Sequence, residues 1–307
     1  MDEHLFKRYL ARRISLGTFA PFAAYRWHRL SSTLPIGWAA YSQFLSEHAD
    51  ELANAINELH EYLGTLMAWR DVLPTLTEDE QHRAVVDFVT PIGTLALLLP
   101  YVIRSRFIYS VAHLSHQANK LKLRAWRDDL PLDTELYFEH ADQYGQHWHS
   151  YGKLKAALER IADKTFSSAT HDFRNKYNHR YSPRIELGVT GRVTRMVDQN
   201  GKVSYGFGET PPLKLQDIVR LLTQQHENCL KAFERYQSLV HEQSDAINQE
   251  IENKGLGQVT ASFTQNLKTD DESEPANVPA QGKATTVWGI DFTSTPSRRK
   301  PITCLTC

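Results

Sequence analysis

Cysteine is scarce in this 307-residue chain, which contains only Cys229, Cys304 and Cys307. An odd and sparse set of cysteines does not build a disulfide framework, so a reducing cytoplasm is the expected compartment. Cys304 and Cys307 form a single C-x-x-C motif without the second pair that a zinc site requires. These residues predict neither a disulfide scaffold nor a metal centre.

The signals of several enzyme classes are also missing. The sequence has no glycine-rich phosphate loop, no G-x-S-x-G nucleophile elbow and no H-E-x-x-H metal helix. Nucleotide hydrolysis, esterase chemistry and zinc proteolysis therefore lack support. The histidine pairs 113/116 and 147/149 have no cysteine or carboxylate set at ligand spacing, so we expect surface or core histidines there, and no cofactor.

No charge of one sign dominates, because 35 Lys and Arg residues face 36 Asp and Glu residues. Without a global positive field, any contact with nucleic acid must come from a local patch. The N-terminus begins with acids and lacks the basic start and apolar core of a secretory signal. The apolar window 84–103 is interrupted by Asp87, Pro91 and Pro100, which favours a buried helix of a soluble protein over a membrane span.

Hydrophobic residues make up 41% of the chain, enough for a sizeable core. Apolar residues recur at helical spacing over 38–66, 103–121 and 218–247, which predicts three long amphipathic helices, the second beginning after a break at Pro100. Trp148 to Ile161 predict a further helix. The apolar positions from Phe166 to Tyr177 continue that helix or begin another after a break near Asp163.

A β-hairpin is predicted at about 190–208, because two alternating stretches flank Asn200-Gly201, a signal for a type I′ turn. The expected organisation is an N-terminal helical segment over 1–36, a helical bundle over 37–253 and a disordered tail over 254–307. The fold class is therefore all-α, with a small hairpin inserted into the bundle. Within the tail, residues 287–292 form an apolar island that is either inert or docks on a partner.

The segment with the most functional content is Arg174-Asn175-Lys176-Tyr177-Asn178-His179, near the end of a helix that Pro183 should stop. Arginine offers a planar charged fork that matches a phosphate, and histidine moves protons near neutral pH. Five positions turn about 140° on an ideal helix, so Arg174 and His179 share a groove only if the last turn tightens or the histidine lies past it. Asn175 lies one turn before His179, where it orients the imidazole or binds a phosphate oxygen.

Positive charge is concentrated around this segment. Residues 174–195 contain one acid, Glu186, and six cations, a local charge of +5 that suits several backbone phosphates. The cations are Arg174, Lys176, Arg180, Arg184, Arg192 and Arg195. Tyr177 and Tyr181 offer stacking surfaces for unpaired bases. The patch predicts contact with a nucleic-acid backbone.

The stretch from His171 to Arg180 resembles the signature of the HEPN superfamily, helical-bundle proteins common in toxin-antitoxin and antiphage systems. That signature is an arginine, often followed by asparagine, and a histidine after four to six intervening residues, which Arg174, Asn175 and His179 match. The resemblance implies metal-independent RNA cleavage by the ribose 2′-hydroxyl, with His179 in proton transfer and Arg174 stabilising the transition state. It also implies a homodimer that brings two motifs into one cleft, and an antitoxin or other regulatory protein as a possible partner.

Two other interpretations of the same residues stay open. Arg174 could serve the fold by pairing with Asp172 or Glu186, and His179 by capping its helix, where the macrodipole favours a cation. The protein would then be a non-catalytic RNA-binding or protein-interaction module, or a structural partner protein. The basic residues Arg104 and Arg106 are most simply interpreted as a solvated helix face.

Overall fold

The computed structural model describes residues 3–31 and 34–253, all within the first of two compact units, Met1–Thr260 and Ala261–Cys307. The predicted tail, with its apolar island at 287–292 and the motif Cys304 to Cys307, lies outside the described residues.

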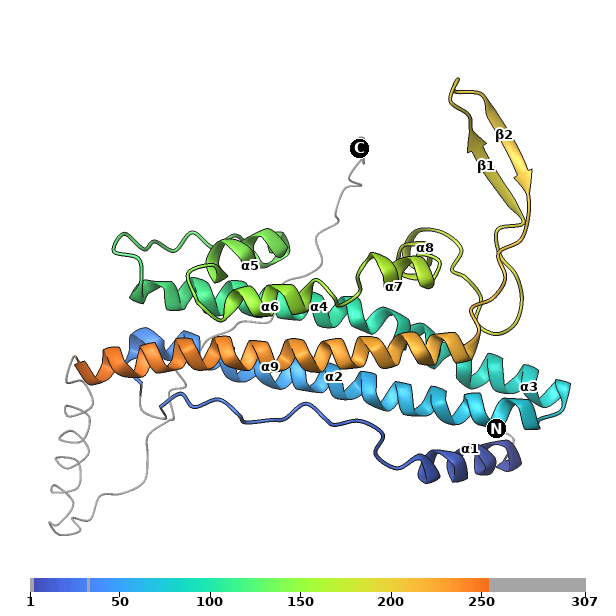
Figure 1. The fold of residues 1–307 in the computed structure, drawn as a ribbon, viewed down its shortest axis with the longest axis horizontal. Helices are drawn as coiled ribbons and strands as arrows, with labels where there is room; N and C mark the ends of the chain where they lie inside the picture. Colours follow the sequence, from blue (N-terminus) through green and yellow to red (C-terminus); the bar gives the residue numbers. More distant parts are fainter. Residues whose placement is uncertain (1–2, 32–33, 254–307) are drawn as a thin grey trace, which may run out of the picture. The chain divides into compact units, whose positions relative to one another are not determined.

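The described residues form a helical bundle with one hairpin, as the sequence predicts (Figure 1). The helices are α1 Glu3–Leu16, α2 Ala39–Val72, α3 Glu78–Ala84, α4 Thr90–Ala118, α5 Phe138–Gly145, α6 Tyr151–Leu158, α7 Lys164–Ala169, α8 Phe173–His179 and α9 Leu215–Asn253. Short 3-10 turns lie at Ile36–Trp38, Leu73–Thr75, Asn119–Leu121 and Asp133–Glu135. The N-terminal segment predicted over 1–36 is helical as far as Leu16, and residues 17–31 then run without helix along the bundle.

Three long helices, α2, α4 and α9, pack on one another and form the core. Their apolar stripes are the ones that the sequence predicts, and most of these side chains are fully buried. A buried polar chain joins the three helices: the Tyr41 hydroxyl donates to Gln243 at 2.9 Å, and the Gln243 amide donates to Ser115 at 3.0 Å. Because buried polar groups are costly when unpaired, this chain fixes the register of α2, α9 and α4.

The predicted helix break at Pro100 is wrong, since α4 continues through that proline. Proline removes one backbone donor and costs helix stability, but Leu97, Leu99 and Ile103 around it are buried against the bundle. The irregularity lies earlier, in a π-helical turn over Val85–Val89. By length and composition, the helical stretch Glu78–Leu121 could cross a membrane, although α4 also packs against α2, α5 and α9 as a core helix does. The fold is compatible with a soluble protein.

The segment after α5 is more divided than its apolar pattern predicts. Of the residues from Trp148 to Ile161, only Tyr151–Leu158 are helical, as α6. The break expected near Asp163 lies at residues 159–163, and a second break at Thr170 to Asp172 makes α7 and α8 separate short helices. The motif lies in α8, which ends at His179, ahead of the stop predicted from Pro183.

The hairpin consists of β1 Val193–Val197 and β2 Val203–Phe207, paired antiparallel. The predicted type I′ turn is wrong, because only Gly201 has a positive φ, +77°, whereas that turn needs two such residues. The Asp198 carboxylate accepts from the amides of Asn200 and Lys202, and this local bonding selects a wider loop with glycine in the left-handed position. Ile185 and Leu213, both buried, anchor the base of the hairpin through a β-bridge.

Candidate functional site

The motif helix α8 begins with an unusual reversal of the chain. His171 and Asp172 both adopt left-handed backbone angles, with φ of 54° and 57°. Such angles cost about 1–2 kcal/mol for a residue with a side chain. Hydrogen bonds offset this cost: the Asp172 amide donates to the Ser167 carbonyl at 2.7 Å, and the Lys176 amide donates to the Asp172 carbonyl at 3.0 Å. The reversal sets the direction in which α8 leaves α7.

One side of α8 is buried and the other is open. Phe173 is 1% exposed and anchors the helix on the bundle, where α8 contacts α4. Tyr177 is half exposed and lies parallel to Phe173, with 6.0 Å between ring centroids. Arg174, Asn175 and His179 are exposed. The three residues of the motif are therefore accessible to a ligand.

Arg174 forms neither of the two ion pairs, with Asp172 or Glu186, that the sequence left open. Its guanidinium lies over the Tyr101 ring, 5.2 Å from the centroid. Asp172 instead accepts from Asn175 at 2.9 Å and from the Ser167 hydroxyl at 3.4 Å. Glu186 accepts from the Leu215 amide and pairs with Lys214. Among the described residues, no carboxylate lies within ion-pair distance of Arg174.

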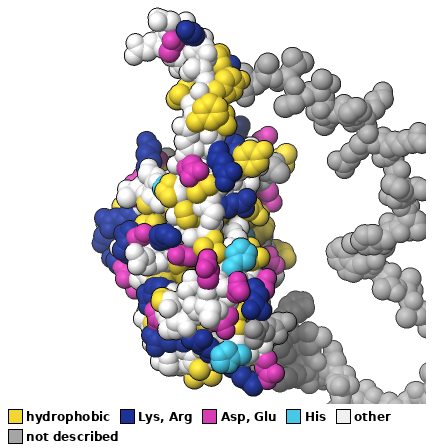
Figure 2. Space-filling model, turned by 90° about the vertical axis from the view of Figure 1, so that its right-hand side faces the viewer, with side chains coloured by type: hydrophobic (Ala, Val, Ile, Leu, Met, Phe, Trp, Pro, Cys, Tyr) yellow, Lys and Arg dark blue, Asp and Glu magenta, His cyan; other side chains and the backbone are white. Residues whose placement is uncertain are grey.

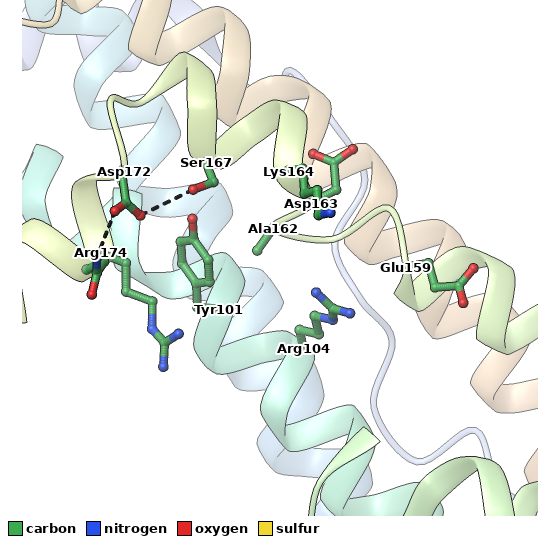
Figure 3. A pocket seen from close by; sticks show the side chains of 10 residues that line it. Tyr101, Arg104, Glu159, Ala162, Asp163, Lys164, Ser167, Asp172 and Arg174 are labelled. Atoms are coloured by element: carbon green, nitrogen blue, oxygen red, sulfur yellow. Dashed lines mark hydrogen bonds between the residues drawn. The ribbon is translucent and has the colours of Figure 1, made fainter. Parts of the chain in front are cut away.

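Arg174 and Asn175 line an open pocket of about 530 Å³ between α4, α6, α7 and α8 (Figure 3). Its charged lining consists of Arg104, Lys164 and Arg174 together with Glu159, Asp163 and Asp172. Arg104 lies one turn from Tyr101 on α4, and its Nε is buried without a hydrogen-bond partner among the described residues. A buried guanidinium nitrogen that lacks an acceptor favours an anionic ligand.

Two of the three carboxylates in the pocket are already engaged. Asp163 caps α7 by accepting from the Phe166 amide at 2.8 Å. Asp172 is held by Ser167 and Asn175, which Figure 3 shows as dashed lines. Burial raises the pKa of the Tyr101 hydroxyl, so that the group stays protonated and can donate a hydrogen bond. The pocket therefore combines guanidinium, ammonium and hydroxyl donors with three carboxylates, two of which already accept hydrogen bonds.

His179 stands apart from this pocket. It is the last residue of α8, five positions after Arg174, and it is not among the residues that line the cavity. On an ideal helix the two side chains diverge by about 140°. The described residues provide no hydrogen-bond partner for the imidazole, and Asn175 is bonded to Asp172 rather than to His179. The structure brings together Arg174 and Asn175 at the pocket but leaves His179 outside it.

The other predicted RNA-binding residues are spread over a longer surface. Lys176, Tyr177 and Arg180 belong to α8 or follow it directly. Arg184 lines a separate cavity of about 350 Å³ next to α3 and α4. Arg192 and Arg195 lie on the hairpin, where both are exposed. The six cations of residues 174–195 are therefore spread along the surface and do not form one compact patch.

Sequence reasoning missed Tyr101, Arg104 and Lys164 as parts of the site. The only signal was the cationic character of Arg104, which was assigned to a solvated face of its helix. The histidines at 113 and 116 are bonded to Asp133 and Asp128, respectively. In the described part of the chain, no group of three or more His, Cys, Asp and Glu residues is placed to hold a metal ion.

Comparison with known proteins adds no further assignment: no protein-family model, no curated protein and no solved structure matched the chain.

Proposed function

We propose that the protein is an endoribonuclease of the HEPN type, in which Arg174 binds the scissile phosphate and His179 transfers protons. The observation that carries the proposal is that Arg174 is held in place but has no ion-pair partner in the described part of the chain. Its guanidinium is held over Tyr101 in an open pocket, without a carboxylate partner among the described residues. A permanently charged fork that is positioned but not neutralised is suited to a phosphate.

The proposed chemistry needs no further reactant. The ribose 2′-oxygen attacks the adjacent phosphorus, and the bond from phosphorus to the 5′-oxygen breaks. The 2′-hydroxyl loses its proton and the leaving 5′-oxygen gains one, so that the products are a 2′,3′-cyclic phosphate and a 5′-hydroxyl. His179 serves as the proton carrier near neutral pH, while Arg174 stabilises charge on the pentavalent transition state.

The divergence of the two side chains suggests how the site is completed. Residues five apart on an ideal helix have Cα atoms about 9 Å apart, and their side chains diverge by about 140°. A homodimer that places α8 against its copy would bring His179 of one subunit to Arg174 of the other. Such a dimer is what the HEPN resemblance implies, and the exposure of both residues leaves them available for it.

The proposal is tested with the purified full-length chain and a mixed set of single-stranded RNAs. We expect cleavage in the presence of EDTA, with 5′-hydroxyl and cyclic phosphate ends. A single 2′-deoxy substitution at the cleaved position should block the reaction. Arg174→Ala and His179→Ala should each lower the single-turnover rate at least about 100-fold, the scale of losing one transition-state donor or one proton carrier.

Matched controls are Arg235→Ala and His149→Ala, which remove an exposed cation and an exposed histidine elsewhere on the bundle. Both should retain the activity of the parent protein. The nuclease proposal is overturned if the parent leaves every RNA intact, or if the Arg174 and His179 variants cleave as well as the controls. A mixture of the two inactive variants should regain part of the activity if the site is shared between subunits, because one composite site is then intact.

The second candidate is a non-catalytic RNA-binding module, favoured by the absence of His179 from the pocket lining. RNA binding without cleavage, unaffected by His179→Ala but weakened by loss of Arg180 and Arg184, would support it. Both candidates share the expected compartment, the cytoplasm, and both allow regulation by an antitoxin or another protein. A role in stress response or antiphage defence is proposed only for the first candidate, the nuclease.

A further inference from the structure

The hairpin has one face that is almost entirely apolar. Side chains alternate along a strand, and the register pairs Val193 with Phe207, Arg195 with Tyr205 and Val197 with Val203. These six side chains share one face. The opposite face carries Thr194, Met196, Ser204 and Gly206. Arg195 is therefore the one charged group in the middle of the apolar face.

This face has no cover among the described residues. Phe207 is 86% exposed and Tyr205 62%, and the three valines are exposed as well. The strands pair with each other and make no extensive contact with a described helix. Figure 1 shows the hairpin projecting from the bundle, and Figure 2 shows hydrophobic side chains along the projection. An isolated two-stranded hairpin is marginally stable in water, so a bound partner would stabilise it.

The charges of the hairpin indicate which partner fits. Arg192, Arg195 and Lys202 provide three cations, whereas the carboxylate of Asp198 is taken up by the amides of its own turn. An apolar protein surface packed on this face would bury Arg195 without a counter-ion, which is costly. A polyanion with flat apolar groups meets both the cations and the rings. Single-stranded RNA has that chemistry.

We infer that the hairpin is a single-stranded RNA arm, in which Tyr205 and Phe207 stack on unpaired bases and Arg195 contacts the backbone. The two aromatic residues are two positions apart on one strand, about 7 Å, so that each ring is available to a different base. The inference deepens the proposed function and rests on it for the nature of the ligand. It assigns substrate capture to the hairpin and catalysis to α8.

The test measures binding of the full-length chain to a fluorescent single-stranded RNA and to a duplex of the same sequence. The double variant Tyr205→Ala with Phe207→Ala should raise the Kd for the single strand at least about tenfold, the scale expected for lost base stacking. Tyr205→Phe should bind like the parent. Arg195→Ala should reduce the salt dependence of binding by about one counter-ion, and Arg195→Lys should restore it.

Met196→Ala is the matched control, because it removes an exposed apolar side chain from the opposite face of the same hairpin. It should leave the Kd unchanged. All variants should keep the helical circular dichroism and melting temperature of the parent. If the aromatic double variant binds RNA as tightly as the parent, the inference is overturned. It is overturned too if that variant loses self-association in sedimentation while RNA affinity stays the same, since the face would then contact a second copy.

Failure of the nuclease proposal and failure of the hairpin inference can be told apart by measuring cleavage and binding separately. If the nuclease proposal holds, Arg174→Ala and His179→Ala should bind the single strand in a hairpin-dependent way yet cleave it at least about 100-fold more slowly than the parent, whereas the aromatic double variant should lose affinity for the single strand. Binding that depends on the hairpin in a protein without nuclease activity leaves the arm intact and removes only the catalytic assignment. Cleavage without hairpin-dependent binding removes only the arm.

Discussion

The guanidinium of Arg174 lies over the ring of Tyr101, with 5.2 Å between the guanidinium carbon and the ring centroid. Tyr101 belongs to the core helix α4, whereas Arg174 belongs to the short surface helix α8. The ring positions the cation through its quadrupole without supplying a negative charge. An ion pair would have positioned Arg174 equally well but would have neutralised it. The contact therefore keeps the arginine both ordered and charged.

Tyr101→Leu is expected to lower kcat/KM for RNA cleavage by roughly fivefold, the equivalent of about 1 kcal/mol for a lost cation–π contact. The loss should be mainly in kcat, because Arg174 remains but is no longer positioned to stabilise the transition state. Tyr101→Phe keeps the ring and should differ little from the parent. Steady-state kinetics with a defined RNA measure both, and equal activity of the leucine and phenylalanine variants would show that the ring has no such role.

A second prediction concerns pH and the buried pair of His60 and His226, whose rings are 5.3 Å apart between α2 and α9. Burial, with a smaller contribution from His60, lowers the pKa of His226 to about 4 from an ordinary 6.5. The unfolded chain thus binds a proton that the folded chain excludes. The contribution of neutral His226 to the free energy of unfolding is fully present above pH 6.5. It is lost as the pH falls toward 4, and the loss amounts to at most about 3 kcal/mol.

Denaturation by urea at pH 7 and at pH 4.5 measures this loss. His226→Leu should reduce the difference in unfolding free energy between the two pH values, since leucine does not titrate and Nε2 of His226 has no hydrogen-bond partner among the described residues. His149→Ala, at an exposed position, should leave the difference as it is in the parent. An unchanged pH dependence in the leucine variant would contradict the assignment.

The long helices and the hairpin could be predicted because their signals are local and extend over many residues. The stripes of α2 and α9 each continue over 30 residues or more, and no competing pattern interrupts them. The helix break predicted at Pro100 was wrong because the loss of helix stability at a proline is a local effect. The packing that offsets it, around Leu97 and Ile103, depends on the whole bundle. The turn at Gly201 was misjudged although its cause is local, since the carboxylate of Asp198 bonds the loop amides.

The site could be predicted only as far as its residues lie close together in the sequence. Arg174 and Asn175 belong to one motif and do line the pocket. Tyr101 and Arg104 lie about 70 residues earlier, and only the packing of α8 on α4 brings them to the motif. The helical spacing of Arg174 and His179 already indicated that the two diverge within one chain.

A third prediction concerns the reversal before α8. His171 has a left-handed φ of 54°, and its Nδ1 is buried without a hydrogen-bond partner among the described residues. His171→Gly relieves both costs and should raise the unfolding free energy by about 0.5–1 kcal/mol, after the greater freedom of glycine in the unfolded chain is included. Ser168→Gly, inside α7, should instead lower it by a similar amount. Thermal and urea unfolding compare the two, and destabilisation by both would show that His171 is not strained.

The last prediction concerns the attachment of the hairpin to the bundle. A Cβ placed on Gly93 of α4 would lie 2.9 Å from Cδ1 of Ile185, the buried residue at the hairpin base. Gly93→Ala therefore has two opposing effects on the free energy of unfolding. The clash lowers it by about 1–3 kcal/mol, and the higher helix propensity of alanine raises it by about 1 kcal/mol. Alone, the substitution should be neutral or destabilising. In the background of Ile185→Val, which removes Cδ1, it should stabilise by about 1 kcal/mol.

A double-mutant cycle on unfolding free energies isolates this coupling, which should exceed the roughly 0.5 kcal/mol scatter of independent sites. Gly152→Ala is the control, because a Cβ at that helical glycine meets no atom within 4 Å. Its effect should be the same with isoleucine or valine at position 185. If the effect of Gly93→Ala is also independent of residue 185, the hairpin base does not pack on α4 as described. Because Ile185 packs the base of the hairpin on the same helix that carries Tyr101 and Arg104, that result would also remove the described contact between the hairpin base and the helix that lines the pocket.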